Sequence, residues 1–246
     1  PPIRRDGTRW EWKLKDWAYD RASMTVIAPS KWVAGVAQEG LLGRFPIEHI
    51  PHGIDTDVYR PLSTSECRAR LGLPQNKNVL MFAATRLDNP GKGGDLLLET
   101  LQNIPKARKE EYTLLLMGAD NPAFSELAGI ETVQLGYVNS DDRKVEAYSA
   151  ADLFVSPTRA ETLGLVLMES IACGTPVVAF DVGGVSDIAR PGKTGQLAKP
   201  ENPRSLREAI FDVLEAENRY RQMSQTCRRV AEEEYALDLW VERHVN

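Results

Sequence analysis

The sequence is poor in the residues that build metal sites and disulfide frameworks. Its 246 residues include three cysteines and three histidines, and Cys67, Cys173 and Cys227 stand far apart without metal-ligand spacing. This pattern argues against a structural zinc site. We expect free thiols in a reducing cytoplasm and no metal ion in the functional site.

Excess positive charge and long apolar runs are also lacking. The 30 Lys and Arg residues are outnumbered by 35 Asp and Glu residues, which gives a net charge of −5. This balance argues against a nucleic-acid partner, because such proteins usually carry a basic patch. No apolar run approaches the roughly 18–20 residues that a membrane span needs. The chain begins at Pro1 rather than Met, so we expect it to be a piece of a longer protein.

Short apolar segments alternate with helical patterns along most of the chain. The segments are apolar nearly throughout, which is typical of parallel strands covered on both faces. Strands are predicted at 24–29, 47–51, 78–85, 112–118, 131–136, 152–157, 176–180 and 194–198. Helices are predicted at 93–103, 122–128, 141–150, 164–173 and 203–217, and residues 203–246 carry no strand signal. The alternation predicts a doubly wound, Rossmann-like α/β sheet.

The stretch "PHGIDTDVYRPLS" (51–63) has the prolines, glycine and aspartates of a linker. Residues 1–50 are therefore expected to pack apart from residues 64–246. Near the start, Trp10, Leu14 and Trp17 fall on one face of a predicted helix. We interpret this face as packing against a domain. The rival interpretation is a membrane-surface helix, suggested by its Trp, Lys and Arg content but weakened by its acidic residues.

The first chemistry-bearing stretch is "ATRLDNPGKGGD". Arg86 directly follows a strand, and Lys92 precedes two glycines at a helix start. Two cations at a glycine-rich turn suit an anion with several oxygens, such as a diphosphate. The plain alternative is a solvated basic loop. The spacing fits neither the Walker loop nor the G-x-G-x-x-G fingerprint of dinucleotide sites.

The second stretch runs from Thr158 to Gly164, between a strand and the next helix. The free N–H groups of Leu163, Gly164 and Leu165 are expected to point out of the helix start, where the dipole favours negative charge. This makes a second phosphate-binding element, facing Arg86 and Lys92.

Glu161 and Glu169 stand eight positions apart in the same region. Glu161 lies ahead of the helix and Glu169 more than a turn inside it, so a close dyad that shares a proton is not expected. Each carboxylate could accept hydrogen bonds from two neighbouring hydroxyl groups, one on either side of a diphosphate. Glu169 as a helix-surface residue and Glu161 as a helix N-terminal charge would give the same sequence pattern. The pair alone therefore leaves both the binding and the structural interpretation open.

Four stretches of the sequence, including the one that carries Glu161 and Glu169, match the ordered motifs of a known family. "SPTRAETLGLVLMESIACGTPVVAFDVGGVSDI" resembles the signature of retaining glycosyltransferases of family 4, which have the GT-B fold. "HIPHGIDTDVYRP" is similar to the interdomain "I-P-N-G-V-D…F-P" of that family, and "TRLDNPGKGGDLLLETL" to its "G-R-L…K-G…L-L-x-A". "VQLGYVNSDDRKVEAYSAADLFVSPT" resembles "L-G-x-V…L-x-x-x-Y-x-x-A-D-x-x-x-x-P-S". His52 replaces the usual Asn and Thr85 the usual Gly, and both changes leave Arg86 and the glutamates untouched.

The resemblance implies a role for each candidate residue. Catalytic roles fall to Arg86, Lys92 and Glu161, with Arg86 and Lys92 on the diphosphate of a nucleotide-sugar. Glu161 would contact hydroxyl groups of the donor sugar, and Thr162 would also belong to the nucleotide-sugar site. The backbone of Leu163, Gly164 and Leu165 would lie near the β-phosphate. Glu169 would lie at the ribose, and the backbone of Tyr137 and Val138 at the base.

The implied activity is transfer of a sugar, with retention and without a cofactor, to a saccharide or lipid-linked acceptor. The chain would hold the donor-binding domain (64–246) and a remnant of the acceptor domain (1–50). Polysaccharide or glycolipid assembly in the cytoplasm, with peripheral contact at the inner membrane face, is the expected setting. The isolated chain is expected to be inactive in transfer without the missing N-terminal domain. The rivals are a non-catalytic nucleotide-sugar-binding module and an epimerase or phosphorylase of the same fold.

The other features that stand out in the sequence are expected to be mostly structural. Asp141 and Asp142 precede a helix, which favours an N-terminal cap over a metal-binding pair. "DVGGVSDI" (181–188) is predicted to line the donor cleft, although paired glycines also serve plain turns. Cys173 is expected in the core.

Overall fold

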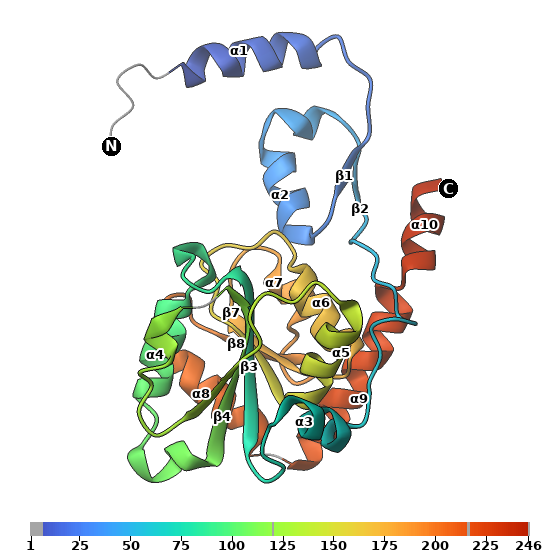
Figure 1. Cartoon of the computed structure of the whole chain (residues 1–246). Helices are drawn as coiled ribbons and strands as arrows, with labels where there is room; N and C mark the ends of the chain where they lie inside the picture. The colour runs from blue at the N-terminus through green and yellow to red at the C-terminus, as the bar shows by residue number, and fades with distance from the viewer. Residues whose placement is uncertain (1–6, 120, 216, 246) are drawn as a thin grey trace. The chain divides into compact units, whose positions relative to one another are not determined.

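The computed structural model describes residues 7–119, 121–215 and 217–245. The chain divides into two compact units, Pro1–Pro51 and His52–Asn246 (Figure 1). Each unit contains its own parallel sheet. The interpretation of the first unit as the remnant of an acceptor domain stays a prediction.

The first unit contains a strand–helix–strand crossover. β1 (Val26–Ala28) pairs in parallel with β2 (Ile47–His49), and α2 (Lys31–Glu39) connects them through the short 3₁₀ helix η1 (Leu41–Arg44). α2 begins after Ser30, whose hydroxyl oxygen accepts a hydrogen bond from the Val33 N–H at 3.2 Å. This satisfies one of the N–H groups that every helix start leaves without a partner inside the helix.

α1 (Thr8–Tyr19) forms where the helical spacing predicts it, but it buries none of its residues. Trp10, Leu14 and Trp17 are exposed, so the predicted packing of this face is not seen within the described ranges. The polar side of the helix makes the contacts instead: Arg44 pairs with both Asp16 and Asp20.

The second unit is a six-stranded, fully parallel sheet in the order β5-β4-β3-β6-β7-β8. Successive residues of β3 point into two different cores: Met81 and Ala83 into one, Leu80 and Phe82 into the other. Burial on both faces explains the nearly unbroken apolar runs and confirms the doubly wound α/β prediction. The strands are β3 (Asn78–Arg86), β4 (Tyr112–Ala119), β5 (Glu131–Gln134), β6 (Leu153–Ser156), β7 (Val177–Phe180) and β8 (Gly195–Ala198).

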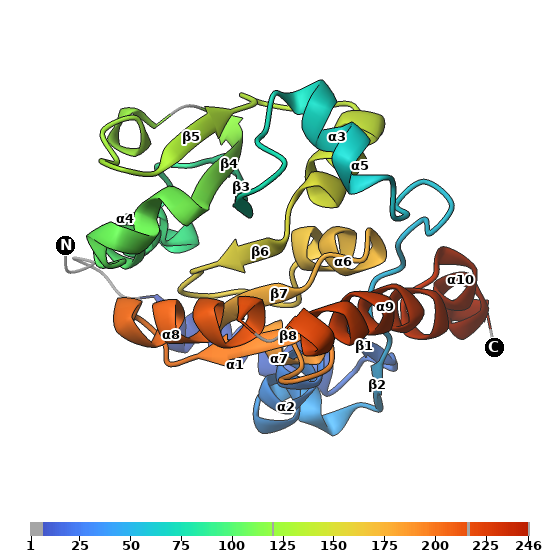
Figure 2. The ribbon, with the colours of Figure 1, turned by 90° about the horizontal axis from the view of Figure 1, so that it is seen from below.

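Helices cover both faces of this sheet (Figure 2). α4 (Gly94–Gln102) and α8 (Pro203–Leu214) lie on one face. The opposite face is covered mainly by α3 (Thr64–Leu71), α5 (Asp141–Ala150), α6 (Leu165–Ala172), α7 (Val185–Ile188) and α9 (Glu217–Glu234). The remaining helical elements are η2 (Pro90–Lys92), η3 (Lys106–Glu111), η4 (Pro122–Phe124) and α10 (Leu237–Val245). Within the described part, no helix is both long and apolar enough to cross a bilayer.

The order of the strands fixes where a ligand can bind. From β3 the chain proceeds outward through β4 to β5, and it then returns to β6 and proceeds the other way through β7 to β8. β3 and β6 are therefore neighbours whose following connections leave in opposite directions. In open α/β sheets a ligand-binding crevice lies at such a switch point, outside the carboxyl ends of the strands.

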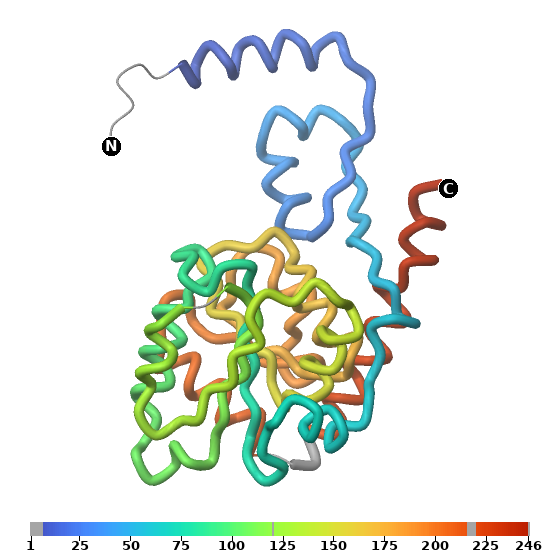
Figure 3. Tube along the Cα trace, in the orientation of Figure 1, coloured from blue at the N-terminus to red at the C-terminus, as the bar shows by residue number. Residues whose placement is uncertain are grey.

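One segment differs from the sequence prediction, and a second shows how the predicted linker is held. The helix expected at 122–128 is reduced to the 3₁₀ turn η4, because Asn121 caps the turn through the Ala123 N–H and the chain turns away after Phe124 enters the core. The segment predicted to be a linker is anchored at Ile54. Ile54 is buried, and its N–H donates to the Tyr235 carbonyl at 2.8 Å, so this segment runs beside the C-terminal helices (Figure 3).

A nearly buried ion pair joins α3 to the sheet. The Arg68 guanidinium donates to Asp152 Oδ2 at 2.6 Å, and the same oxygen accepts the Val79 N–H at 2.6 Å. Asp152→Ala would leave the 5% exposed Arg68 without its counter-charge. We expect a loss of about 3 kcal/mol in the free energy of unfolding, because an unpaired buried charge is strongly destabilising.

Urea denaturation would measure this loss. The control Glu126→Gln changes an exposed charge and is expected to alter the free energy of unfolding by less than about 0.5 kcal/mol. An Asp152→Ala protein as stable as the control would contradict the structural role of the pair.

Candidate functional site

The loops that follow β3 and β6 meet at the switch point. Lys92, at the end of η2, places its Nζ 2.8 Å from Oε2 of Glu161, which lies in the loop after β6. The structure therefore brings together a cation and a carboxylate that are 69 positions apart in the sequence. Both belong to the predicted site.

Backbone contacts hold the two loops against each other. The Gly91 carbonyl accepts hydrogen bonds from the Arg159 N–H at 2.9 Å and from the Thr158 hydroxyl at 3.0 Å. Gly93 has φ of +71°, and a Cβ placed there would lie 1.9 Å from the Pro157 carbonyl oxygen. Only glycine fits at this position, because both the backbone conformation and the close approach exclude a side chain.

The paired glycines predicted to line the cleft support the Glu161 loop. The Glu161 carbonyl accepts the Gly184 N–H at 3.0 Å, and a Cβ on Gly183 would lie 2.0 Å from the same oxygen. The Glu161 carboxylate also accepts the Thr162 N–H through Oε1 at 3.0 Å. The loop that carries Glu161 is therefore fixed on both sides of the residue.

α6 begins as an uncapped helix beside this ion pair. Gly164 is its N-cap residue, with φ of +96°, and no side chain caps the first turn. Leu163 is buried, whereas Leu165 and Thr162 are exposed. An uncapped N-terminus concentrates partial positive charge and unsatisfied N–H groups, which suits an anion.

Arg86 ends β3 and is exposed. Its guanidinium forms a two-pronged hydrogen bond with Asp88, at 3.0 Å from Nε to Oδ1 and 2.9 Å from Nη2 to Oδ2. Arg86 is thus placed at the predicted edge of the sheet, but its described partner is Asp88 rather than Lys92 or Glu161. An exposed pair of this kind is weak and can be exchanged for a stronger anion.

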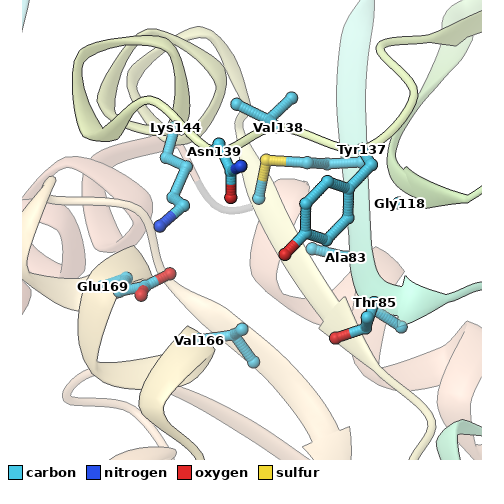
Figure 4. Close-up of a pocket in the computed structure, with 11 residues that line it drawn as sticks. Ala83, Thr85, Gly118, Tyr137, Val138, Asn139, Lys144, Val166 and Glu169 are labelled. Carbon is cyan, nitrogen blue, oxygen red and sulfur yellow. The ribbon is translucent and has the colours of Figure 1, made fainter.

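A cavity of about 200 Å³ lies beside these loops (Figure 4). It contains three of the predicted residues: Tyr137, Val138 and Glu169. Its other lining residues come from the ends of β3 and β4, the loop before α5, and the starts of α5 and α6; they are Ala83, Ala84, Thr85, Met117, Gly118, Asn139, Lys144 and Val166. Backbone polar groups, two charged side chains and an apolar floor meet here, as in small-molecule sites.

Glu169 is half-buried at one side of the cavity. Its Oε2 accepts the Tyr148 hydroxyl at 2.6 Å. Burial raises the pKa of the Glu169 carboxyl above its ordinary value, while the hydrogen bond from Tyr148 and the charge of Lys144 oppose this shift. Glu161 and Glu169 thus bind separate partners, Lys92 and Tyr148, rather than each other.

Lys144 and Tyr59 were not singled out from the sequence, and Asp141 was singled out only as a helix cap. Lys144 Nζ lies 2.9 Å from Asp141 Oδ1, which also accepts the Tyr59 hydroxyl at 2.8 Å. The helix cap predicted at Asp141 was wrong, because Ser140 caps α5 and leaves the Asp141 carboxylate for this cluster. Lys144 stands where the motif L-x-x-x-Y has leucine, so a cation at that position was the available signal.

The remaining sequence predictions here are structural. Cys173, Cys67 and Cys227 are buried free thiols, as the core assignment of Cys173 requires. Burial raises the pKa of all three thiols above its ordinary value. Within the described ranges, no group of three or more His, Cys, Asp or Glu side chains is arranged to hold a metal ion.

Together the switch point, the uncapped helix and the adjoining cavity define an α/β protein with an anion- and nucleotide-sized site at the carboxyl edge of its sheet. The profile of the family described as "Glycosyl transferases group 1" matches residues 63–230. The chain belongs to this family.

Curated relatives agree with this assignment. D-inositol 3-phosphate glycosyltransferase 1 of Catenulispora acidiphila is 35% identical over 216 residues, which cover 78% of this chain and 51% of the relative. D-inositol 3-phosphate glycosyltransferase of Mycolicibacterium smegmatis is 33% identical over 187 residues, which cover 71% of this chain and 41% of the relative. The chain thus spans about half or less of the length of these relatives.

Solved structures share the fold. Sucrose-phosphate synthase of Thermosynechococcus elongatus superposes with a TM-score of 0.82 at 24% identity, covering 98% of this chain and 61% of that one. The Anabaena protein HepE, in complex with UDP and glucose, superposes with a TM-score of 0.77 at 22% identity, covering 96% and 66%. The predicted GT-B class is confirmed.

The raised pKa of Glu169 gives a testable consequence for stability. The folded protein binds the Glu169 proton more tightly than the unfolded chain, so this group lowers stability as the pH rises through the raised pKa. Glu169→Gln removes the charge and keeps an oxygen for Tyr148. We expect the variant to melt at a higher temperature than the wild type at about pH 8 and at nearly the same temperature at about pH 5.

Thermal denaturation across this pH range, with nucleotide titrations beside it, would check the expectation. The same variant should bind nucleoside diphosphates more weakly, because a neutral amide accepts hydroxyl hydrogen bonds less strongly than a carboxylate. A lower melting temperature than the wild type at about pH 8 would contradict the electrostatic account of Glu169.

Proposed function

We propose that the parent protein transfers a sugar from a nucleotide-sugar to a saccharide or lipid-linked acceptor, with retention at the anomeric carbon. This chain would be mainly the donor-binding half. The observation that carries the proposal is the ion pair between Lys92 and Glu161 at the start of α6, next to the cavity that contains Glu169. The UDP and glucose bound in the fold neighbour HepE support a donor of this chemistry.

The diphosphate is proposed to bind between the two loops. Lys92 can contact a phosphate while it keeps its bond to Glu161, because an ammonium group has three N–H donors. The uncapped N–H groups at Leu165 and Val166 would contact the same anion. Arg86 would exchange Asp88 for a phosphate oxygen, since its present pair is exposed.

The nucleoside is proposed to occupy the cavity. Tyr137 and Val138 lie at its wall, where their backbone can meet the base, and Glu169 lies where it can accept hydrogen bonds from the ribose. Glu161 would accept hydroxyl hydrogen bonds from the donor sugar, at the opposite end of the diphosphate. Lys92 holds the Glu161 carboxylate in place for this contact.

The chemical step requires stabilisation of negative charge on the leaving diphosphate. Lys92, Arg86 and the α6 N-terminus are proposed to supply this stabilisation from fixed positions, without a metal ion or a cofactor. In front-face displacement the leaving diphosphate takes the proton of the acceptor hydroxyl as the new glycosidic bond forms and the bond to phosphate breaks. The protein groups then act by holding the diphosphate rather than by moving a proton.

We place this activity in polysaccharide or glycolipid assembly in the cytoplasm, at the inner face of the membrane. The three buried free thiols support a reducing compartment. The exposed tryptophans of α1, with Lys13 and Lys15 on the same helix, support peripheral membrane contact.

Arg86→Ala and Lys92→Ala in the whole protein test the proposed charge stabilisation. Each is expected to lower kcat by about 10²–10³, the range for removal of one preorganised donor. Arg204→Ala is the matched control, because Arg204 is exposed on α8 and pairs with Glu208. Turnover assays with radiolabelled nucleotide-sugars would measure the effect. Unchanged turnover in both variants would refute the assignment.

A separate experiment tests whether this chain binds the donor while transfer requires the whole protein. The 246-residue chain and the whole protein are titrated with UDP, GDP and ADP by calorimetry and then assayed for transfer. We expect both to bind the same diphosphate with similar affinity, and only the whole protein to transfer sugar. Interconversion of the nucleotide-sugar without an acceptor would instead identify an epimerase.

A further inference from the structure

Lys144 is a charged cavity residue to which the proposed chemistry assigns no role. It lies on the first turn of α5, and its side chain is 24% exposed. Figure 4 shows its ammonium group directed toward the carboxylate of Glu169, which belongs to α6 and lies on the same side of the cavity. A cation and a carboxylate from two different helices therefore face the same ligand space.

Both groups are held by other side chains. The Asp141 carboxylate binds Lys144 Nζ at 2.9 Å, and Tyr59 fixes that carboxylate through its hydroxyl at 2.8 Å. Tyr148, one turn further along α5, fixes Glu169 through a hydrogen bond of 2.6 Å. Lys144 and Glu169 are thus positioned before a ligand binds. This reduces the side-chain conformational entropy that is lost on binding.

The hydrogen-bonding capacity of the two groups is complementary. The Lys144 ammonium has three N–H donors, of which one binds Asp141 and one lies 3.5 Å from the Tyr59 hydroxyl. Glu169 has acceptor positions beyond the one that Tyr148 uses. A donor and an acceptor side by side suit a pair of adjacent hydroxyl groups, since each hydroxyl both accepts and donates a hydrogen bond.

We propose that Lys144 and Glu169 together bind the vicinal diol of the ribose, and that Lys144 makes the site selective for ribonucleotides over deoxyribonucleotides. This inference rests on the proposed function, because it assumes that the cavity holds a nucleoside. Lys144 donates to one hydroxyl oxygen while Glu169 accepts a hydroxyl proton. The ion pair with Asp141 keeps the ammonium in place and restricts the motion of the long Lys144 side chain.

The test is a comparison of binding with and without the ribose hydroxyls. The 246-residue chain is titrated by calorimetry with UDP, GDP and ADP to find the diphosphate that binds, and then with its 2′-deoxy and 3′-deoxy counterparts. We expect the wild type to bind at least one deoxy counterpart about tenfold more weakly, the loss of one charge-assisted hydrogen bond.

Lys144→Met keeps an unbranched side chain as far as Cε and removes the ammonium group. We expect it to weaken binding of the diol-containing diphosphate about tenfold and binding of the discriminated deoxy counterpart less than about twofold, so that the selectivity disappears. Lys193→Met is the matched control. Lys193 is exposed and precedes β8 at the amino edge of the sheet, opposite the cavity, and its change is expected to leave both affinities as they are.

The remaining outcomes overturn the proposal. Equal weakening of the ribo and deoxy ligands by Lys144→Met would assign the ammonium to the base or the phosphates, and unchanged binding would exclude it from the site. Lys144→Leu, which has no N–H donor and has the same expected loss of selectivity, carries the test if the methionine variant melts far below the wild type. A wild type that binds none of the three diphosphates would overturn the proposed function itself.

Discussion

The site depends on one constraint, the adjacency of β3 and β6 at the switch point of the sheet. These strands are neighbours in space, yet the loops that follow them belong to separate stretches of the chain. The Gly91 carbonyl accepts the Arg159 N–H, and a side chain on Gly93 would collide with the Pro157 carbonyl. This close approach places Lys92 on Glu161 and leaves the start of α6 beside both. Cations, carboxylate and helix dipole can act on one ligand because two strands pair.

The charged groups at this edge are balanced in pairs. Glu161 has Lys92 in a partly buried pair, and Arg86 has Asp88 in an exposed pair that is open to exchange with a ligand. Glu169 differs, because burial raises its pKa and its described hydrogen-bond partner is the neutral Tyr148 hydroxyl. A carboxylate held in this way lowers the stability of the unliganded protein and gains most when ligand hydroxyls donate to it. The arrangement is therefore that of a site organised for binding rather than for stability.

Much of the fold was predictable because burial on both faces leaves a direct trace in the sequence. The runs that became β3 and β4 are apolar throughout, and the glycines at strand ends mark where loops must approach closely. The cavity was less predictable. Tyr59, Asp141 and Lys144 come from two separate segments, and only the packing of α5 beside α6 brings them to Glu169. Spacing indicates that Arg86 follows a strand, but not that Asp88 will bind it. The exposed face of α1 shows a further limit of sequence-based prediction. Periodicity predicts that a helix has an apolar face, but it does not identify what covers that face.

The most direct measurement of the central claim is a crystal structure of this chain with its bound nucleoside diphosphate. The account predicts diphosphate oxygens within hydrogen-bond distance of Lys92 Nζ and of the first N–H groups of α6. It also predicts the ribose against Glu169 in the cavity lined by Tyr137 and Val138. A diphosphate bound away from the carboxyl ends of β3 and β6, or a ribose directed away from Glu169, would contradict it.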